Sequence, residues 1–181
     1  PFIFNLTVYP LLLVLNSFNS HLLDDKMSEP VAIPKKLPHC YLTRFSNLQA
    51  AVGLHQLEKF EDTILRRIKN AELLSENINI HRLISLPLVP ENVKHTFLYY
   101  FIQVKNREIF RKKLIFKGVD TKKDANQACS HLDIFKDEYN YCSVSERISK
   151  ENVLIPNYPC LEERDMLYLS QKINAVLKEM T

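Results

Sequence analysis

The sequence predicts an α/β fold of the α+β kind, in which one long helix leads into a small sheet with helices on one face. Apolar residues recur at helical spacing between residues 46 and 77 with no proline among them, which is typical of a single long helix. From residue 96 onwards, runs of aromatic and β-branched residues alternate with amphipathic segments, which predicts a sheet covered by helices. We expect three parts: an apolar segment with a proline-rich linker at residues 1–43, a bridging helix at residues 44–78 and a small C-terminal α/β domain at residues 79–181.

The start of the long helix is marked by a capping box at Ser46-Asn47-Leu48-Gln49. In this motif the serine hydroxyl and the glutamine amide bond backbone groups that lack a partner in the first helical turn. Asp62 and Arg66 stand four residues apart with the acid first, the order that stabilises a helix. We expect one uninterrupted helix from Ser46 to Asn77, bridging two domains.

The small domain is predicted as a series of short elements. The stretch at residues 96–104 is rich in aromatic and β-branched residues and is typical of a strand. Gly118 follows an amphipathic stretch at the position where glycine commonly ends a helix. In chain order we expect a strand at 96–104, a helix at 106–117, a short strand at 119–121, a helix at 143–150, a strand at 153–155 and a final helix at 161–180.

Composition argues against several classes of function. The net charge of +3, with acids and bases interspersed, gives no support for a nucleic-acid or anionic-membrane partner. The two glycines, Gly53 and Gly118, cannot form the glycine-rich loops that hold nucleotide phosphates. We therefore expect no nucleic acid, no membrane and no nucleotide held by such a loop.

The cysteines do not predict a disulfide framework or a metal site. A small disulfide-stabilised domain would carry a denser set, so reduced thiols in a cytoplasmic protein are the better interpretation. Cys129 lies near His131 and His39 lies beside Cys40, but no second pair stands at the spacing of metal ligands. The cysteines are irregularly spaced: Cys40, Cys129, Cys142 and Cys160.

The chain begins with proline rather than methionine, which indicates a piece of a longer polypeptide, and residues 2–15 are mostly apolar. This segment lacks a basic start, contains Asn5 and Pro10, and is shorter than the roughly 20 residues of a membrane span. We expect it to pack against protein rather than to anchor the chain in a membrane. An extended linker is predicted after it by closely spaced prolines: Pro30, Pro34 and Pro38.

Side-chain chemistry alone predicts no catalytic site. Ser143, Ser145 and Ser149 lack the glycine-flanked turn that exposes the nucleophile of a serine hydrolase. Tyr99 and Tyr100 lie in the predicted strand without an interleaved basic run, so they indicate sheet packing rather than stacking on nucleic-acid bases.

Ordered motifs nevertheless carry a resemblance to a known family. Residues 44–58 read R-F-S-N-L-Q-A-A-V-G-L-H-Q-L-E, which resembles the signature R-M-S-x-L-Q-A-A-x-G-x-x-Q-L. Residues 144–159 contain V-S-E-R-I-S and V-L-I-P-N-Y-P, which resemble A-E-x-x-S and L-x-L-P-x-Y-P. Between them, L-I-F-K-G-V at residues 114–119 is similar to the step L-x-x-x-G-I. These residues resemble the C-terminal part of the DegT/DnrJ/StrS family of pyridoxal-phosphate-dependent sugar aminotransferases.

The resemblance implies fold type I, in which a large cofactor domain precedes a small C-terminal domain. It implies transfer of an amino group from an amino-acid donor to a nucleotide-linked keto sugar, in amino-sugar or cell-surface polysaccharide biosynthesis, by a cytoplasmic homodimer. Pyridoxal phosphate needs a lysine for its Schiff base and an acid at its pyridine nitrogen, and both belong to the large domain. No lysine here lies in the family's lysine motif. We therefore expect this chain alone neither to bind the cofactor nor to transaminate, and we assign it no catalytic residue.

Arg44 is the site residue that the resemblance carries over. It either contacts an anion across the dimer, as part of the cofactor site, or caps the long helix, since a guanidinium suits both roles. Other positions depart from the family: Leu42 replaces an Asn that reaches the partner's cofactor phosphate, Leu98 replaces a His although Tyr100 matches, and Asp124-Ala125 replaces a His-Tyr pair. These departures leave open a second hypothesis, a non-catalytic pseudoenzyme-like domain with an assembly or regulatory role.

Overall fold

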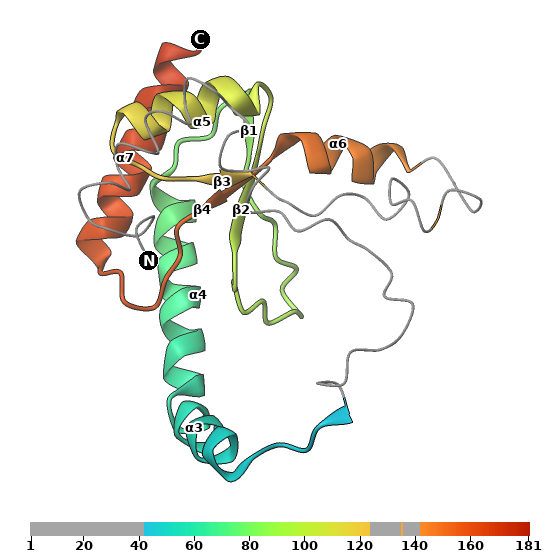
Figure 1. Ribbon diagram of the computed structural model, residues 1–181. Coiled ribbons are helices and arrows are strands. Elements are labelled where there is room, and N and C mark those ends of the chain that lie inside the picture. Colours follow the sequence, from blue (N-terminus) through green and yellow to red (C-terminus); the bar gives the residue numbers. More distant parts are fainter. Residues whose placement is uncertain (1–41, 124–134, 136–141) are drawn as a thin grey trace.

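The computed structural model describes residues 42–123, 135 and 142–181 (Figure 1). The predictions for the N-terminal apolar segment, for the linker, for the Cys–His pairs and for Asp124-Ala125 lie outside the described residues. The elements in chain order are α3 (Asn47–Glu58), α4 (Phe60–Asn77), β1 (Ile84–Ser85), β2 (Tyr100–Val104), α5 (Arg107–Phe116), β3 (Lys122–Lys123), α6 (Ser143–Glu151), β4 (Asn152–Ile155) and α7 (Glu163–Glu179).

The sheet is 4-stranded and antiparallel, in the order β1-β2-β4-β3. Its centre is the pair β2 and β4, with Tyr100 opposite Ile155. β1 is only 2 residues long and was not predicted, although it lies in the apolar run L-I-S-L-P-L-V at residues 83–89. The prediction of a strand at 119–121 is wrong. The N–H of Val119 bonds to the last turn of α5, and strand pairing with β4 begins only at Lys122, opposite Leu154.

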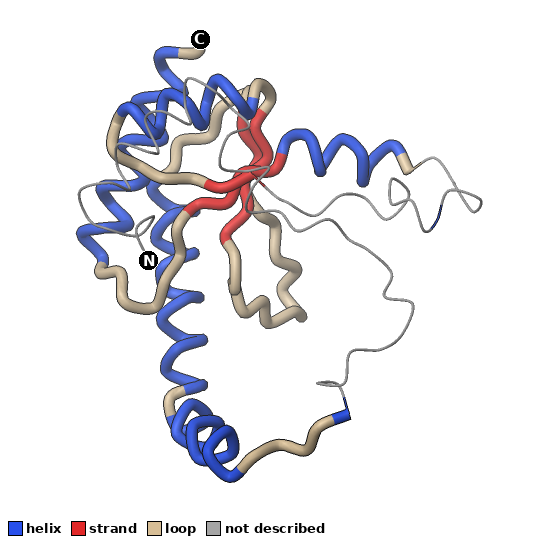
Figure 2. The backbone as a smooth tube through the Cα atoms, viewed as in Figure 1, coloured by secondary structure: helices blue, strands red, loops and turns tan. Residues whose placement is uncertain are grey.

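One face of the sheet forms the core. Tyr100, Ile102 and Val104 alternate along β2 and are fully buried on the face covered by α4, α5 and α7. Figures 1 and 2 show these helices on one side of the sheet, whereas α6 projects from the other side. The predicted fold class is confirmed, with α6 as the exception to helices on one face. The helices contribute fully buried side chains to this core: Ala71, Leu74, Phe110, Leu114, Met166, Ile173 and Val176.

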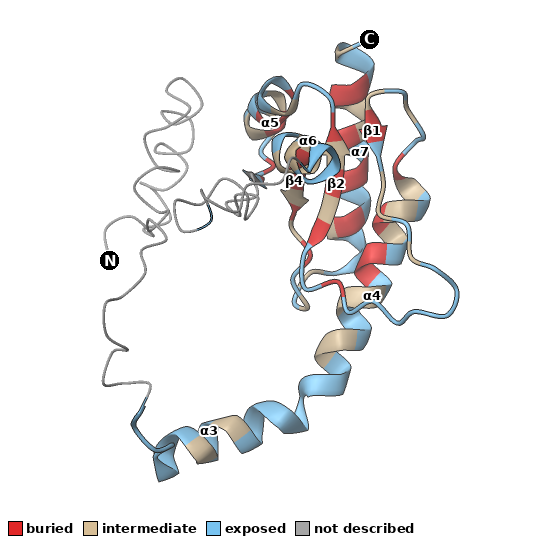
Figure 3. Ribbon diagram, turned by 90° about the vertical axis from the view of Figure 1, so that its right-hand side faces the viewer, coloured by how far each residue is buried: buried red, intermediate tan, exposed pale blue. Residues whose placement is uncertain are grey.

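The long helix predicted from Ser46 to Asn77 is in fact two helices. Lys59 separates α3 from α4, with φ −99° and ψ 0°. Its N–H bonds to the Gln56 carbonyl at 3.2 Å, the tighter spacing of a 3₁₀ turn. Figures 2 and 3 show α3 turned away from the axis of α4. No proline or glycine marks this joint, and no buried residue of α3 holds the two helices in line.

The end of α5 requires glycine at residue 118, as predicted. Gly118 has φ +81°, its N–H bonds to the Ile115 carbonyl at 2.9 Å, and the N–H of Val119 bonds to the Leu114 carbonyl at 2.9 Å. This pattern satisfies the last carbonyls of a helix through one left-handed residue. A Cβ at Gly118 would meet the Tyr168 hydroxyl at 3.5 Å, an ordinary contact, so the backbone angle rather than crowding demands glycine.

A hydrogen bond joins the sheet to α4 inside the core. The Tyr100 hydroxyl lies 2.8 Å from the Ser75 hydroxyl, which itself donates to the Ala71 carbonyl at 2.9 Å. Tyr100 is therefore the donor to Ser75. Burial raises the pKa of Tyr100, and the bond to Ser75 offsets only part of that rise, so the phenol stays protonated and able to donate.

This assignment predicts that Ser75→Ala destabilises the domain more than Tyr100→Phe. Loss of the serine leaves a buried phenol without an acceptor, at about 1–3 kcal/mol, whereas loss of the phenol leaves Ser75 bonded to Ala71, at about 0.5–1.5 kcal/mol. Urea unfolding followed by circular dichroism measures both free energies. A larger loss for Tyr100→Phe would reverse the assigned direction of the bond.

Candidate functional site

The first family-like motif begins at the N-terminus of α3. Ser46 is extended, with φ −78° and ψ 157°, and its hydroxyl accepts from the Gln49 N–H at 3.3 Å. The Gln49 side-chain oxygen accepts from the Ser46 N–H at 2.9 Å. The predicted capping box is therefore confirmed. No acidic residue lies in the first turn of α3, so the positive end of the helix dipole is not neutralised from within the helix.

Arg44 lies two residues before the cap, on exposed chain leading into α3. Ser46 and Gln49 complete the cap between themselves, so α3 is capped without the guanidinium. Among the residues that the structure describes, Arg44 has no hydrogen bond or ion pair. Its side chain is thus accessible to an anion, and its assignment as a cofactor contact stays a prediction.

Large apolar side chains are exposed on and beside α3. Their exposed fractions run from 54% for Phe60 to 77% for Leu48, and α3 buries no residue at all. Figure 3 shows the contrast with the far half of α4, which is buried where it meets the sheet. A helix with apolar residues on several faces is normally buried, and patches of this kind mark interfaces. We call this set the α3 surface: Leu42, Phe45, Leu48, Val52, Leu54, Leu57, Phe60 and Leu65.

The V-L-I-P-N-Y-P part of the second family-like motif lies in β4 and the loop that follows it. Val153 and Ile155 are buried in the centre of the sheet. Asn157 is only 4% exposed, and its Nδ2 donates to the Phe97 carbonyl at 2.9 Å and to the Arg67 carbonyl at 3.2 Å. These residues therefore connect the sheet to α4, which makes this motif a structural one.

Asn70 makes the matching contact from the other side of the same joint. It is also 4% exposed, and its Nδ2 donates to the carbonyls of Tyr158 at 3.1 Å and Leu161 at 3.4 Å. Sequence analysis missed both asparagines. A signal existed for Asn70, a polar residue beside Ala71 within the apolar stripe of α4, whereas nothing in the sequence marks Asn157 as buried.

The turn before β2 contains a strained residue. Phe97 has φ 47°, a left-handed conformation that is uncommon for an aromatic residue. Its N–H donates to His95 Nδ1 at 3.1 Å, and Arg67 Nη1 donates to the Leu98 carbonyl at 2.7 Å. This turn is the reason that β2 begins at Tyr100, later than the strand predicted from residue 96. It leaves Leu98 exposed, at the position where the sequence departs from the family's His.

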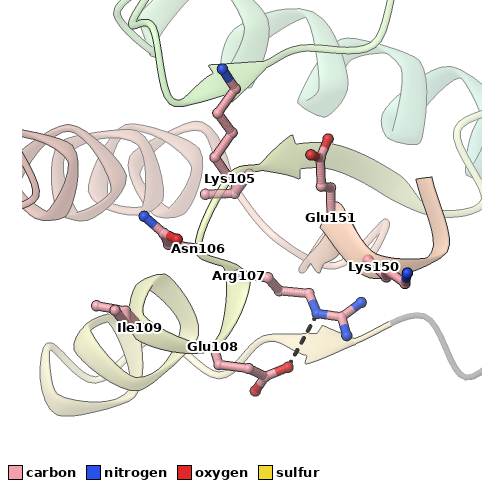
Figure 4. A pocket seen from close by; sticks show the side chains of 8 residues that line it. Lys105, Asn106, Arg107, Glu108, Ile109, Lys150 and Glu151 are labelled. Atoms are coloured by element: carbon pink, nitrogen blue, oxygen red, sulfur yellow. Dashed lines mark hydrogen bonds and ion pairs between the residues drawn. The ribbon is translucent and has the colours of Figure 1, made fainter. Parts of the chain in front are cut away.

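An open hollow of about 460 Å³ lies where β2, α5 and the end of α6 meet (Figure 4). Arg107 is its central cation, but the guanidinium donates to the Ser149 carbonyl at 2.6 Å and to Glu108 Oε1 at 3.2 Å. No residue predicted for a site lies here. The hollow offers charges of both signs and no convergent set of groups for one ligand. It is lined by Val104, Lys105, Asn106, Arg107, Glu108, Ile109, Lys150 and Glu151.

The described part of the chain contains neither a cluster of metal-ligating side chains nor a helix that could span a membrane. Residues 42–123, 135 and 142–181 contain no group of His, Cys, Asp and Glu side chains that could hold a metal ion. The helices among these same residues are too short or too polar to span a bilayer. Cys142 and Cys160 are exposed free thiols.

Comparison with known proteins identifies a family and several relatives to which this chain is similar. The family model for DegT/DnrJ/EryC1/StrS aminotransferases matches residues 20–174. GDP-perosamine synthase of Escherichia coli O157:H7 is 26% identical over 137 residues, which cover 74% of this chain and 37% of that protein.

Solved structures show the same fold. The aminotransferase TlmJ from Streptoalloteichus hindustanus matches with a TM-score of 0.64 and 21% identity, over 74% of this chain and 37% of that one. A DegT DnrJ EryC1 StrS aminotransferase from Brucella abortus matches with a TM-score of 0.63 and 21% identity, over 91% of this chain and 43% of that one. The chain thus spans less than half the length of these relatives. Because the family model covers most of its residues, the chain belongs to the DegT/DnrJ/EryC1/StrS aminotransferase family.

Proposed function

We propose that this chain is the C-terminal part of a pyridoxal-phosphate-dependent aminotransferase that acts on a nucleotide-linked keto sugar in the cytoplasm, in amino-sugar or cell-surface polysaccharide biosynthesis. Family membership supports the reaction class, and similarity to GDP-perosamine synthase supports a nucleotide-linked sugar as substrate. The α3 surface carries the proposal, because a family motif lies on a helix whose apolar side chains are left exposed. Such a helix requires further protein, which we assign to the large domain and to a second subunit.

The described residues do not form a cofactor site by themselves. No lysine whose burial is described is buried. Lys113 and Lys117 are instead paired with Glu179, at 3.0 and 2.6 Å. When bound, pyridoxal phosphate supplies the electron sink for the transfer, but it needs a lysine held in place and an acid at its ring nitrogen. We therefore assign both groups to the large domain, and none of the chemistry to this chain.

Arg44 is the group that this chain would contribute to the assembled site. The unpaired amides of the first turn of α3 and the guanidinium together favour an anion. In the homodimer we assign Arg44 to a phosphate or a carboxylate, of the cofactor or of the substrate. Leu42, exposed just before it, contributes apolar contact only.

The chain alone, mixed with pyridoxal phosphate and reduced with borohydride, should carry no stoichiometric adduct on any single lysine. The reason is that no lysine whose burial is described is buried. Peptide mass spectrometry after digestion locates any adduct. Low labelling spread over exposed lysines is the expected background, and full labelling of one lysine would contradict the absence of a cofactor lysine.

In the complete protein, Arg44→Ala should weaken binding of the cofactor or of the sugar nucleotide by about 1.5–3 kcal/mol, the contribution of a charged hydrogen bond. Leu42→Asn is the control and should leave binding unchanged or tighten it. Equilibrium titration and thermal unfolding are measured together. A lower melting temperature with unchanged binding would make Arg44 structural, and a complete protein that fails to transaminate would favour the non-catalytic assembly or regulatory role.

The chain alone should self-associate through the α3 surface, and Leu48→Ser should reduce this association. Ile80→Ser is the matched control, because Ile80 is 98% exposed but lies outside the α3 surface. Neither side chain is buried, so both variants should keep the stability of the domain. Sedimentation velocity measures the association. Equal effects of the two substitutions would show that the α3 surface is not the contact.

A further inference from the structure

Phe97 holds a backbone angle that its residue type rarely adopts. Its φ of 47° places it in the left-handed region, which costs free energy for an aromatic residue. Its side chain is nonetheless buried, with the ring centroids of Phe97 and His95 4.5 Å apart. Strained residues persist only where their surroundings hold them, and they are concentrated at binding and catalytic sites. The strain at Phe97 therefore indicates a function for the turn that contains it.

Hydrogen bonds from distant side chains hold this turn in place. Asn157 donates to the Phe97 carbonyl at 2.9 Å across 60 residues of sequence, and Arg67 donates to the Leu98 carbonyl at 2.7 Å across 31 residues. The Asn157 amide also donates to the carbonyl of Arg67 at 3.2 Å. At the start of the turn, the Phe97 N–H donates to His95 at 3.1 Å. α4 and the loop after β4 thus determine the path of the turn.

Both N–H groups of the Asn157 side-chain amide donate hydrogen bonds. Its Nδ2 faces two carbonyl oxygens, so the exchanged orientation, with Oδ1 against them, would be repulsive. Its Oδ1 is buried and has no hydrogen-bond partner among the described residues. A buried acceptor without a partner is unfavourable. The protein therefore tolerates a cost at Asn157 in order to hold the carbonyl of Phe97.

The turn at Phe97 determines which side chains are exposed just before β2 begins. Tyr100 is fully buried, so Tyr99 points to the opposite face of the sheet, where its ring contacts that of Phe101 at a centroid distance of 5.8 Å. Leu98 and Tyr99 are 58% and 55% exposed. In Figure 1 the loop before β2 lies on the same side of α4 as the chain leading into α3, away from α5 and α7. Leu42 and Phe45 of the exposed α3 surface belong to that chain, and under the function proposed above this is the side that the large domain and the second subunit cover.

We propose that Asn157 and Arg67 are positioning residues, which hold Leu98 and Tyr99 against the sugar nucleotide in the assembled aminotransferase. The proposal rests on the function proposed above. A tyrosine ring can cover the apolar face of a sugar or stack on a base, and its hydroxyl remains able to hydrogen-bond. Asn157 and Arg67 do not touch the substrate; they act through the backbone of Phe97 and Leu98.

The chain itself provides a matched control for this proposal. Asn70 and Asn157 are equally buried, and each donates its amide to backbone carbonyls at the same joint, but Asn70 does not contact the turn. Asn157→Asp should raise hydrogen exchange of the amides at residues 96–99 by about tenfold or more, the factor that corresponds to loss of one charged or buried hydrogen bond. Asn70→Asp should raise exchange at residues 158–161 and leave 96–99 unchanged. Arg67→Met, which removes only the exposed bond to Leu98, repeats the test if Asn157→Asp does not fold.

In the complete enzyme, Asn157→Asp should raise KM for the sugar nucleotide by about tenfold with a much smaller change in kcat, because the lost contact serves substrate binding. Asn70→Asp should leave KM unchanged. In a Tyr99→Ala background the effect of Asn157→Asp on KM should be smaller than in the unsubstituted enzyme, since the two substitutions remove part of the same contact.

The outcomes separate the parts of the proposal. We call the hold of Asn157 and Arg67 on the backbone of Phe97 and Leu98 the clamp. Equal exchange at residues 96–99 in the two asparagine variants overturns the clamp. If Asn157→Asp speeds hydrogen exchange at residues 96–99 but leaves KM for the sugar nucleotide unchanged, the proposed contact of Leu98 and Tyr99 with the substrate is refuted. An unsubstituted complete protein that neither binds sugar nucleotides nor transaminates refutes the proposed function and the substrate contact with it, while the exchange measurement still decides the clamp.

Discussion

The hydrogen bonds of two buried amides, Asn70 and Asn157, hold α4 to the loop that follows β4, and the rest of the structure depends on this joint. Buried amides are favourable only when they are bonded, so the joint has one preferred geometry. The joint therefore sets the direction of α4, whereas the turn at Lys59 sets the direction of α3 at its far end. Asn157 also bonds Phe97, so the same loop determines the turn before β2.

The two halves of the described chain depend on different sources of stability. The sheet and the helices α4, α5 and α7 bury a continuous apolar core. Lys117 and Lys113 donate hydrogen bonds to the Glu179 carboxylate and so connect α5 to the end of α7. These hydrogen bonds hold the pKa of Glu179 below its usual range. α3 has a complete cap but buries nothing. An isolated helix of this length is marginal in water, and packing normally supplies the difference. The sheet with α4, α5 and α7 thus has a core of its own, whereas α3 gains no stability from buried side chains among the described residues.

Local signals in the sequence predicted the features that arise from neighbouring residues. The capping box at Ser46, the apolar stripe of the last helix and the left-handed glycine at residue 118 are of this kind. The features that were missed arise from contacts between distant residues: the bonds of Asn157 span 60 and 90 residues of sequence. The break at Lys59 escaped for another reason, because helical periodicity continues across it and no local signal marks it. The family resemblance pointed to Arg44, whose role as an anion contact stays a prediction, because no described residue bonds its side chain.

The positions that match the family and those that depart from it differ in their surroundings. Tyr100 matches and is buried in the core, and Gly118 matches where the backbone requires a left-handed angle. Leu42 and Leu98 depart and both are exposed, and the third departure, Asp124-Ala125, lies outside the described residues. In a domain that had lost its function, nothing would restrict substitutions to these exposed positions. Nothing would then preserve the strained backbone of Phe97 or the hydrogen bond that Asn157 donates to it either. Exposure of both described departures on an intact scaffold is the pattern expected of the function proposed above, an aminotransferase with an altered substrate.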